Sequence, residues 1–517
     1  ESLPSDFITF VHRDSQGRVW VGSRGGLALY KGEGRFTVFK PLPDQGEVEP
    51  NYLVCMTEDY EGLLWIGAAS GLYSFDPTTG AFDYHVHDPD KPNSPVLGPV
   101  LSIHCDRSGI IWAGSWHTGL NKYDPGSSKF EVFRYEPGNP LSLDDSAIGS
   151  VFEDRRKVLW VGSGARTPSG RGGALNRKRA GVPDFDRIHF PESEHGQVQS
   201  VYSMLEGSDK HLLVGTNLGL WQFDQSSRRV FRPPFMAGAH PRLWNMSVLA
   251  MAKDPAGRLW VSGLVDGLHR YDFLTRTWKY FQHESGDTTS VMAGDLPTIC
   301  VDEAGQLWVG SDNAGLQVYE PETETFHLVP NLAGEMASIG AIIPAGGNRV
   351  LASTGAGILL CEPEGIIRTY STRTGLPSDY AGRMILDHND DLWVSTGLGL
   401  VNMDLEGDEV LVFDERDGLP KNEIYFASCL TRDGLVYFGG HSGLVSFHPD
   451  SLRRKEFVPP VHITDVAVSD RSLTVGNGSP LQQAMPFTES LELGPQQNDI
   501  SLTFAALDYA HPERNRY

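Results

Sequence analysis

The chain has 517 residues, with 57 Gly and 33 Pro, and it carries 43 Lys and Arg against 66 Asp and Glu, a net charge of −23. This length exceeds that of one ordinary domain. The acidic excess argues against nucleic acid as a partner and against binding to anionic membrane surfaces. The Gly and Pro content suits a fold with many tight turns.

One phrase returns ten times along the chain, at intervals of 42 to 53 residues. It is an apolar run, Asp-x-x-Gly, a small apolar residue, Trp, Val or Ile, Gly-Ser, a short loop, Gly-Leu, and an aromatic residue followed by an acidic one. We call the residue at the Trp position the anchor of each copy. The anchors are Trp20, Trp65, Trp112, Trp160, Leu213, Trp260, Trp308, Leu351, Trp393 and Tyr437. Each copy predicts four short antiparallel strands, the blade of a β-propeller, with Asp and Gly forming a hairpin turn. The fold class predicted is therefore all-β.

The ten blade units predict an order of domains along the chain. Residues 1–140 hold three copies and are expected to form a partial N-terminal propeller, while residues 141–455 hold seven copies and predict a closed seven-bladed C-terminal propeller. A single ring of ten blades is the alternative. The tail at 456–517 leaves the repeat, and strands are expected at Val461–Val468 and Asp499–Phe504. Its roughly 60 residues fall short of the ~100 of an immunoglobulin-like sandwich, so we expect a truncated one.

The repeated residues are interpreted as structural. Trp260 and Trp308 are expected to be buried between blades, as large aromatic side chains usually are. Four cysteines lie in first strands and are interpreted as buried hydrophobes, because inner strands of different blades are too far apart for disulfides. No phosphate-binding loop, zinc spacing or nucleophile elbow stands out. The sequence therefore predicts no catalytic residue, no cofactor and no metal.

Irregular loops give the candidate site. The loop between the second and third strands and the connection to the next blade share one face of a propeller, and most of these loops are short here. Four are not, and they carry aromatic and basic side chains suited to sugar rings and to carboxylate or sulfate groups. The predicted ligand-binding residues are Trp116, His117, Arg166, Arg171, Arg242 and Trp244.

The repeat resembles the two-component regulator propeller repeat, seen in Asp254–Val261 and Gly267–Asp272. The tail resembles the start of the triple-tyrosine (Y-Y-Y) domain, on Asn498–Tyr509, Pro512 and Tyr517. This resemblance implies the periplasmic sensor region of a membrane-bound two-component regulator, often a sensor of oligosaccharides. It also implies a homodimer in the full-length protein, membrane attachment through segments outside this chain, and a histidine kinase or diguanylate cyclase as output. The chain starts at Glu1 without Met, which is compatible with a leader removed before Glu1.

Two other functions stay open at this point. A propeller enzyme, such as a lyase or a glycosidase, needs His and carboxylate groups clustered in one axial pocket. A cell-surface scaffold needs only the propellers and no signalling output.

Overall fold

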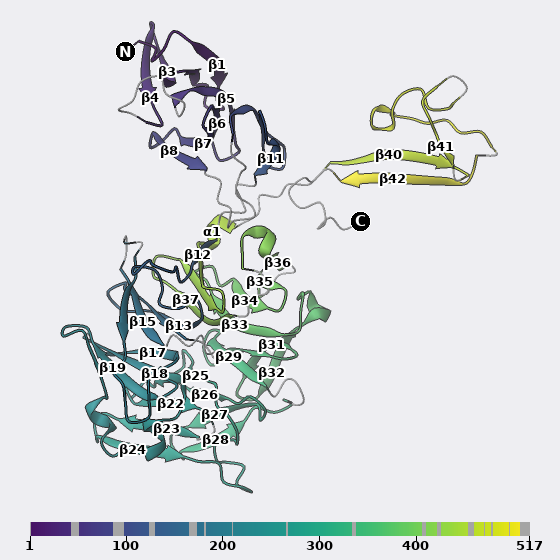
Figure 1. Ribbon diagram of the computed structural model, residues 1–517. Helices are drawn as coiled ribbons and strands as arrows, with labels where there is room; N and C mark the ends of the chain where they lie inside the picture. Colours follow the sequence, from purple (N-terminus) through teal and green to yellow (C-terminus); the bar gives the residue numbers. More distant parts are fainter. Residues whose placement is uncertain are drawn as a thin grey trace. The chain divides into compact units, whose positions relative to one another are not determined.

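The computed structural model describes residues 2–42, 51–85, 98–123, 130–164, 173–179, 182, 184–208, 210–264, 267–332, 338–405, 410–420, 425–452, 460–469, 471–476, 479–495 and 497–506. Most of its strands form four-stranded antiparallel sheets that follow one another along the chain, as expected of propeller blades (Figure 1). No helix within these described ranges is long and apolar enough to cross a membrane.

Ser127–Arg453 forms one compact unit. Seven four-stranded sheets lie in its described residues, and their first strands contact one another in a closed cycle. The first three sheets are β13 (Ile148–Glu153), β14 (Leu159–Ser163), β15 (Ala174–Lys178) and β16 (Asp186–His189); β17 (Val201–Ser208), β18 (His211–Thr216), β19 (Gly219–Asp224) and β20 (Arg229–Phe231); and β21 (Val248–Lys253), β22 (Leu259–Gly263), β23 (Leu268–Asp272) and β24 (Thr277–Phe281).

Three further sheets continue the ring in the same order. They are β25 (Thr298–Val301), β26 (Leu307–Gly310), β27 (Leu316–Glu320) and β28 (Thr325–Leu328); β29 (Ile339–Pro344), β30 (Val350–Thr354), β31 (Gly357–Glu362) and β32 (Gly365–Tyr370); and β33 (Ala381–Leu386), β34 (Leu392–Thr396), β35 (Gly399–Met403) and β36 (Val410–Phe413). Short helices lie in the connections: η3 (Pro234–Met236), η4 (Pro241–Trp244), η6 (Thr372–Thr374), η7 (Glu415–Asp417) and α1 (Pro449–Leu452).

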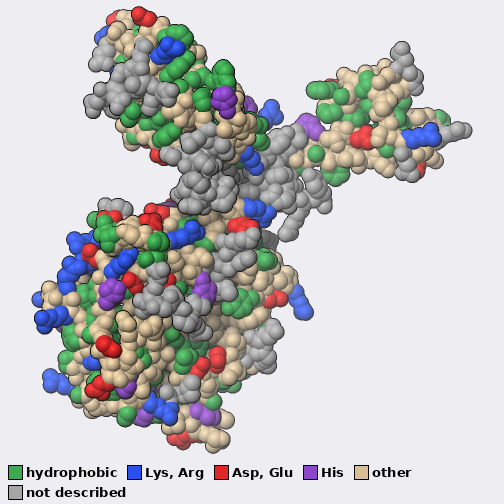
Figure 2. Space-filling model, in the orientation of Figure 1, with side chains coloured by type: hydrophobic (Ala, Val, Ile, Leu, Met, Phe, Trp, Pro, Cys, Tyr) green, Lys and Arg blue, Asp and Glu red, His purple; other side chains and the backbone are tan. Residues whose placement is uncertain are grey.

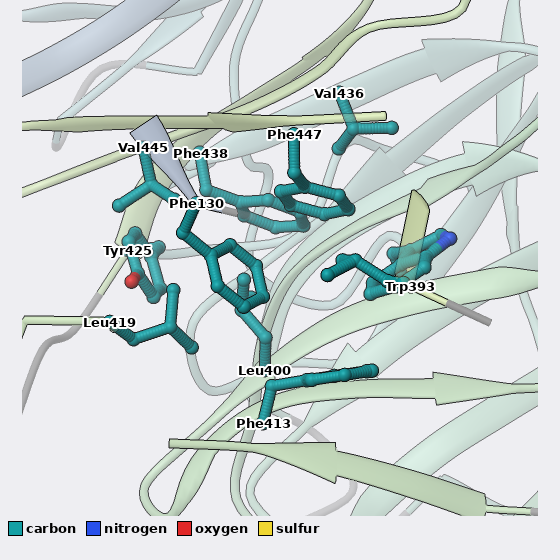
Figure 3. Packing of buried hydrophobic residues seen from close by; sticks show 11 residues of the cluster. Phe130, Trp393, Leu400, Phe413, Leu419, Tyr425, Val436, Phe438, Val445 and Phe447 are labelled. Carbon is teal, nitrogen blue, oxygen red and sulfur yellow. The ribbon is translucent and has the colours of Figure 1, made fainter. Parts of the chain in front are cut away.

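The seventh sheet joins the two ends of the unit. Its inner strands are β37 (Tyr425–Leu430), β38 (Val436–Gly440) and β39 (Leu444–Phe447), and its outer strand is β12 (Glu131–Phe133), which pairs antiparallel with β39. Phe130 precedes β12 and inserts between the sixth and seventh sheets, with ring centroids 5.7 Å from Phe413 and 5.2 Å from Phe447 (Figure 3). The unit therefore begins at Ser127 and not at 141, because the strand expected to end the third copy completes the last sheet instead.

A hydrogen bond explains why Asp and Trp recur together. In each of the seven copies with a Trp anchor, the indole Nε1–H donates to Oδ2 of the Asp six residues earlier, at 2.7–3.0 Å. The other carboxylate oxygen accepts a backbone N–H of the turn, as Asp302 does from Gln306 at 2.8 Å. Where the anchor is Leu213, Leu351 or Tyr437, the earlier residue is no longer Asp. The two side chains therefore act as one pair, and burial of Trp260 and Trp308 between sheets is confirmed.

The N-terminal residues form three sheets of their own. They consist of β1 (Ile8–Arg13), β2 (Val19–Ser23), β3 (Gly26–Gly32) and β4 (Arg35–Phe39); β5 (Leu53–Glu58), β6 (Leu64–Ala68), β7 (Gly71–Asp76) and β8 (Ala81–His85); and β9 (Val100–Cys105), β10 (Ile111–Ser115) and β11 (Gly119–Tyr123). Trp20 and Trp65 fill the seams between successive sheets, as the repeat predicts.

The tail forms a single three-stranded sheet in its described part. β40 (Val461–Val468) lies between β41 (Arg471–Ser472) and β42 (Ile500–Ala506), and η8 (Met485–Phe487) contacts β40. The alternation of Ile500, Leu502 and Phe504 predicts a sandwich strand with one buried face, but these residues are 47%, 54% and 47% exposed. That expectation is wrong for the described residues, because no second sheet lies over β42 in them.

Candidate functional site

A cavity of about 310 Å³ lies on the axis of the Ser127–Arg453 unit. Six of the seven first strands contribute residues at their starts to its wall, and the fourth blade contributes Pro297, directly before β25. Three turns between second and third strands add Leu264, Asp312 and Thr354–Gly355. The cavity therefore lies at the face of the ring on which the irregular loops were predicted to bind ligand.

One repeat position builds this wall. The residue eleven positions before the anchor lines the cavity in every one of the seven blades: Gly149, Tyr202, Leu249, Pro297, Gly340, Gly382 and Phe426. In six blades this residue lies where the register of the first strand against the second shifts, as between Ile148 and Ser150. An extra residue in one strand leaves the ladder and its side chain is re-aimed. In the fourth blade Pro297 precedes β25, where it does not interrupt the ladder.

The wall combines aromatic, acidic and basic side chains. Tyr202, Tyr380 and Phe426 contribute aromatic side chains, and Tyr380 is 53% exposed. Asp295 and Asp312 lie together, because the backbone N–H of Asp312 donates to the Asp295 carbonyl at 3.2 Å. Arg383 contributes a guanidinium. Small-molecule sites usually combine aromatic surfaces with a few polar groups, as this wall does. The cavity is at the small end of the ~300–1,000 Å³ range of ligand pockets.

The structure does not assemble the six residues predicted from the loops. Trp116, which is 64% exposed, and His117 lie in the turn between β10 and β11, outside the propeller unit. Arg166 and Arg171 lie outside the described residues. Arg242 and Trp244 belong to η4 in the propeller. None of the four described residues lines the axial cavity.

Trp244 has a structural explanation. Its side chain packs against the buried cluster between the second and third blades, and its carbonyl accepts a hydrogen bond from Arg232 at 3.0 Å. The Arg232 guanidinium lies 3.9 Å from the ring centroid of Trp221, and burial lowers the pKa of Arg232 to about 10. The long connection that suggested a binding site therefore carries a Trp whose side chain packs between two blades. The position eleven residues before the anchor was the signal that reasoning missed.

Reactive groups are sparse in the described part of the chain. No group of three or more His, Cys, Asp or Glu side chains there is arranged to hold a metal ion. Burial raises the pKa of Cys300, Cys361 and Cys429 to about 12, so these thiols stay protonated at neutral pH and are poor nucleophiles. Figure 2 shows acidic, basic and apolar side chains interspersed over the visible face, without one dominant charge.

The chain is similar to known proteins both in its sequence and in its structure. Residues 2–25 match the family described as two component regulator propeller. Histidine kinase P4 of Formosa agariphila is 31% identical over 133 residues, which are 25% of this chain and 10% of that protein. The match thus spans about a tenth of the kinase.

Solved structures extend the likeness over the whole chain. The extracellular domain assigned to a hybrid two component system of B. thetaiotaomicron is 22% identical with a TM-score of 0.69, covering 99% of this chain and 65% of that one. A second such domain from the same organism is 18% identical with a TM-score of 0.50, covering 98% and 72%. Residues 2–25 therefore carry a two-component regulator propeller repeat, and the chain has the fold of the extracellular domains of hybrid two-component sensors.

Proposed function

We propose that this chain is the ligand-sensing part of the extracytoplasmic region of a membrane-bound two-component signalling protein. In this proposal the propeller binds a carbohydrate or another polar small molecule in its axial cavity. The observation that carries it is the cavity itself, whose wall takes one residue from the same repeat position of each of the seven blades and adds the charged side chains of Asp295, Asp312 and Arg383. A ring held together by its repeated cores gains nothing in stability from such variation, so the variation points to binding.

Signalling is assigned to segments outside this chain. The likeness to extracellular domains of hybrid two-component systems and to a histidine kinase supports a cytoplasmic kinase output, with a diguanylate cyclase as the alternative. The tail from about Pro459 is assigned to the start of a triple-tyrosine domain, on its sequence resemblance. Its role is to transmit a change in the propeller towards the membrane, in a full-length homodimer located in the periplasm.

The chain is proposed to have no catalytic activity of its own. The buried thiols with raised pKa values and the separation of the four described candidate residues into two units support this. A test incubates the chain with a panel of polysaccharides and analyses the products by chromatography. No released product is expected, and release that stops on mutation of the axial cavity would favour an enzyme.

The binding proposal has a test designed from the repeat. Gly340 occupies the position where the third blade has Leu249, so Gly340→Leu introduces into one blade the side chain that another blade already carries. The three atoms nearest to a Cβ added at Gly340 would be Ser353 Oγ at 3.1 Å, Ser353 O at 3.8 Å and Ala381 O at 3.9 Å, so a small shift of the Ser353 hydroxyl lets the blade accept it. Gly476→Leu in the tail is the matched control, because nothing lies within 4 Å of its added Cβ.

The measurement is isothermal titration of both variants and the unchanged chain against a panel of neutral and acidic oligosaccharides. We expect Gly340→Leu to fold, to fill part of the cavity and to weaken binding at least ten-fold, while Gly476→Leu binds like the unchanged chain. Equal binding by all three proteins would place recognition elsewhere and overturn the proposal.

A further inference from the structure

The sixth blade breaks the rule that governs one position of the repeat. The residue ten positions before the anchor is small in the other six blades: Ser150, Ser203, Ala250, Thr298, Ala341 and Ala427. In the sixth blade it is Arg383. A half-buried guanidinium therefore stands where the repeat otherwise has a hydroxyl or a methyl group.

Close packing explains why the position is normally small. Its side chain faces the residue two positions after the anchor. A Cβ added at Gly162 would lie 2.3 Å from Ser150 Oγ, and one added at Gly215 would lie 2.3 Å from Ser203 Oγ. An arginine has no room in that arrangement.

β33 makes room for Arg383 by a wider irregularity than the other blades show. Its pairing with β34 passes from Ala381 directly to Met384, so two residues leave the ladder instead of one. Gly382 takes the crowded place, where an added Cβ would lie 2.5 Å from Ser395 Oγ. Arg383 then lines the cavity, and its Nε–H donates to the Phe426 carbonyl of the next blade at 2.6 Å. That hydrogen bond orients the guanidinium.

The repeated core does not require this arrangement. Desolvating a charged side chain is unfavourable, and six blades fold with a small uncharged residue at the same position. What a guanidinium offers in a cavity is a planar pair of N–H donors that matches a carboxylate or a sulfate. Its position in the wall therefore points to an anionic group on the ligand.

The acidic side of the cavity limits what else the ligand carries. Asp295 and Asp312 line the same cavity, and carboxylates accept hydrogen bonds from hydroxyl groups but repel a second anion. The net charge of −23 also disfavours a polyanion. A ligand with one anionic group and several hydroxyl groups satisfies both sides.

Resting on the proposed function of the axial cavity, we propose that Arg383 determines specificity and that the cavity takes a short acidic sugar with a single carboxylate or sulfate group. Arg383 binds the anionic group, and Asp295 and Asp312 accept hydrogen bonds from the hydroxyl groups. The cavity of about 310 Å³ limits the bound part to a small sugar unit.

The test compares Arg383→Ala and Arg383→Lys with Arg349→Ala. Arg349 is exposed in the turn between β29 and β30, at the other end of its blade, so its removal changes the net charge equally without touching the cavity. Arg383→Gln, which keeps an N–H donor near the Phe426 carbonyl, replaces Arg383→Ala if that variant does not fold. The probes are galacto- and gluco-configured mono- and disaccharides, each as the neutral sugar, the uronate and the O-sulfate. Binding is measured by isothermal titration at fixed ionic strength.

We expect the unchanged chain and Arg349→Ala to bind a uronate or a sulfate at least ten-fold more tightly than the matched neutral sugar. Arg383→Ala should lose that preference and Arg383→Lys should keep part of it. Whether the uronate or the sulfate binds more tightly identifies the anionic group. A preference that survives in Arg383→Ala overturns the inference. Preferred binding of a neutral sugar that Gly340→Leu abolishes overturns it too, while leaving the proposed function intact. Absence of binding by every probe overturns both.

Discussion

The pair formed by Asp302 and Trp308 allows the energetics of the repeat to be tested by two single changes and their combination. Trp308 is fully buried, and its Nε1–H donates to Asp302 Oδ2 at 2.8 Å. Asp302→Ala leaves this donor buried without a partner and removes the acceptor for the backbone N–H of Gln306. An unsatisfied buried polar group costs about 1–3 kcal/mol, so we expect a loss of roughly 2–3 kcal/mol in unfolding free energy.

The second change is Trp308→Leu. Replacing Trp by Ala in a core costs about 3–5 kcal/mol, and Leu retains part of that packing, so we expect roughly 2–4 kcal/mol. The double variant Asp302→Ala, Trp308→Leu recreates the combination that the chain already has at Ala345 and Leu351. Because the double variant leaves neither the indole N–H nor the carboxylate without its partner, its loss should be about 1–2 kcal/mol smaller than the sum of the two single losses.

Calorimetry of the full chain measures these effects as shifts of the propeller transition. About 2 °C is expected for each kcal/mol in a unit of this size, so Asp302→Ala should lower the midpoint by about 4–6 °C. Asp312→Ala is the control, because that carboxylate belongs to the same blade and is exposed. An unchanged midpoint for Asp302→Ala, or a double variant that loses at least the sum of the single losses, would refute the role of the hydrogen bond.

Three further predictions follow from other parts of the chain. His269 is 1% exposed, and burial, with a smaller contribution from His240, lowers its pKa to about 3. The folded state therefore keeps the imidazole neutral. The stability that His269 contributes is complete above about pH 6.5 and is lost as the pH falls towards 3. His269→Phe should accordingly lose less stability than the unchanged chain in thermal melts between pH 7 and pH 4, and equal losses would contradict the assignment. Phe130→Ala should destabilise the propeller by about 3–5 kcal/mol, as judged by its calorimetric transition, because Phe130 closes the ring between the sixth and seventh blades; an unaffected transition would show that closure does not depend on it. Light scattering should find this chain largely monomeric and a chain extended beyond Tyr517 dimeric, whereas a stable dimer of residues 127–453 alone would remove the tail from the dimer contact.

Much of the fold could be predicted from the sequence, because a repeated phrase reports repeated contacts. The recurrence of Trp after Asp-x-x-Gly placed strands and turns correctly, and it predicted the burial of Trp260 and Trp308. The sequence could not show that β12 joins the last sheet, because Glu131–Phe133 looks like the last strand of its own copy. Only the pairing with β39, more than 300 residues away, shows where it belongs.

The candidate site was harder to predict for a related reason. Loop length drew attention to Trp244, whose bulk packs between two blades. Gly340 and Phe426 are unremarkable residues in apolar strands, and they become a wall only because a register shift re-aims them towards the axis. Arg383 could have been noticed by aligning the copies, because it is the single large residue at its repeat position among the seven blades.

The most direct test of the account is hydrogen–deuterium exchange of this chain with and without the sugar probe that binds most tightly. The axial cavity predicts that protection on binding appears together at the starts of β29, β33 and β37, in peptides that contain Gly340, Arg383 and Phe426. Protection confined to the turn between β10 and β11, or to the tail strands β40 and β42, would contradict the claim that the propeller axis is the sensing site.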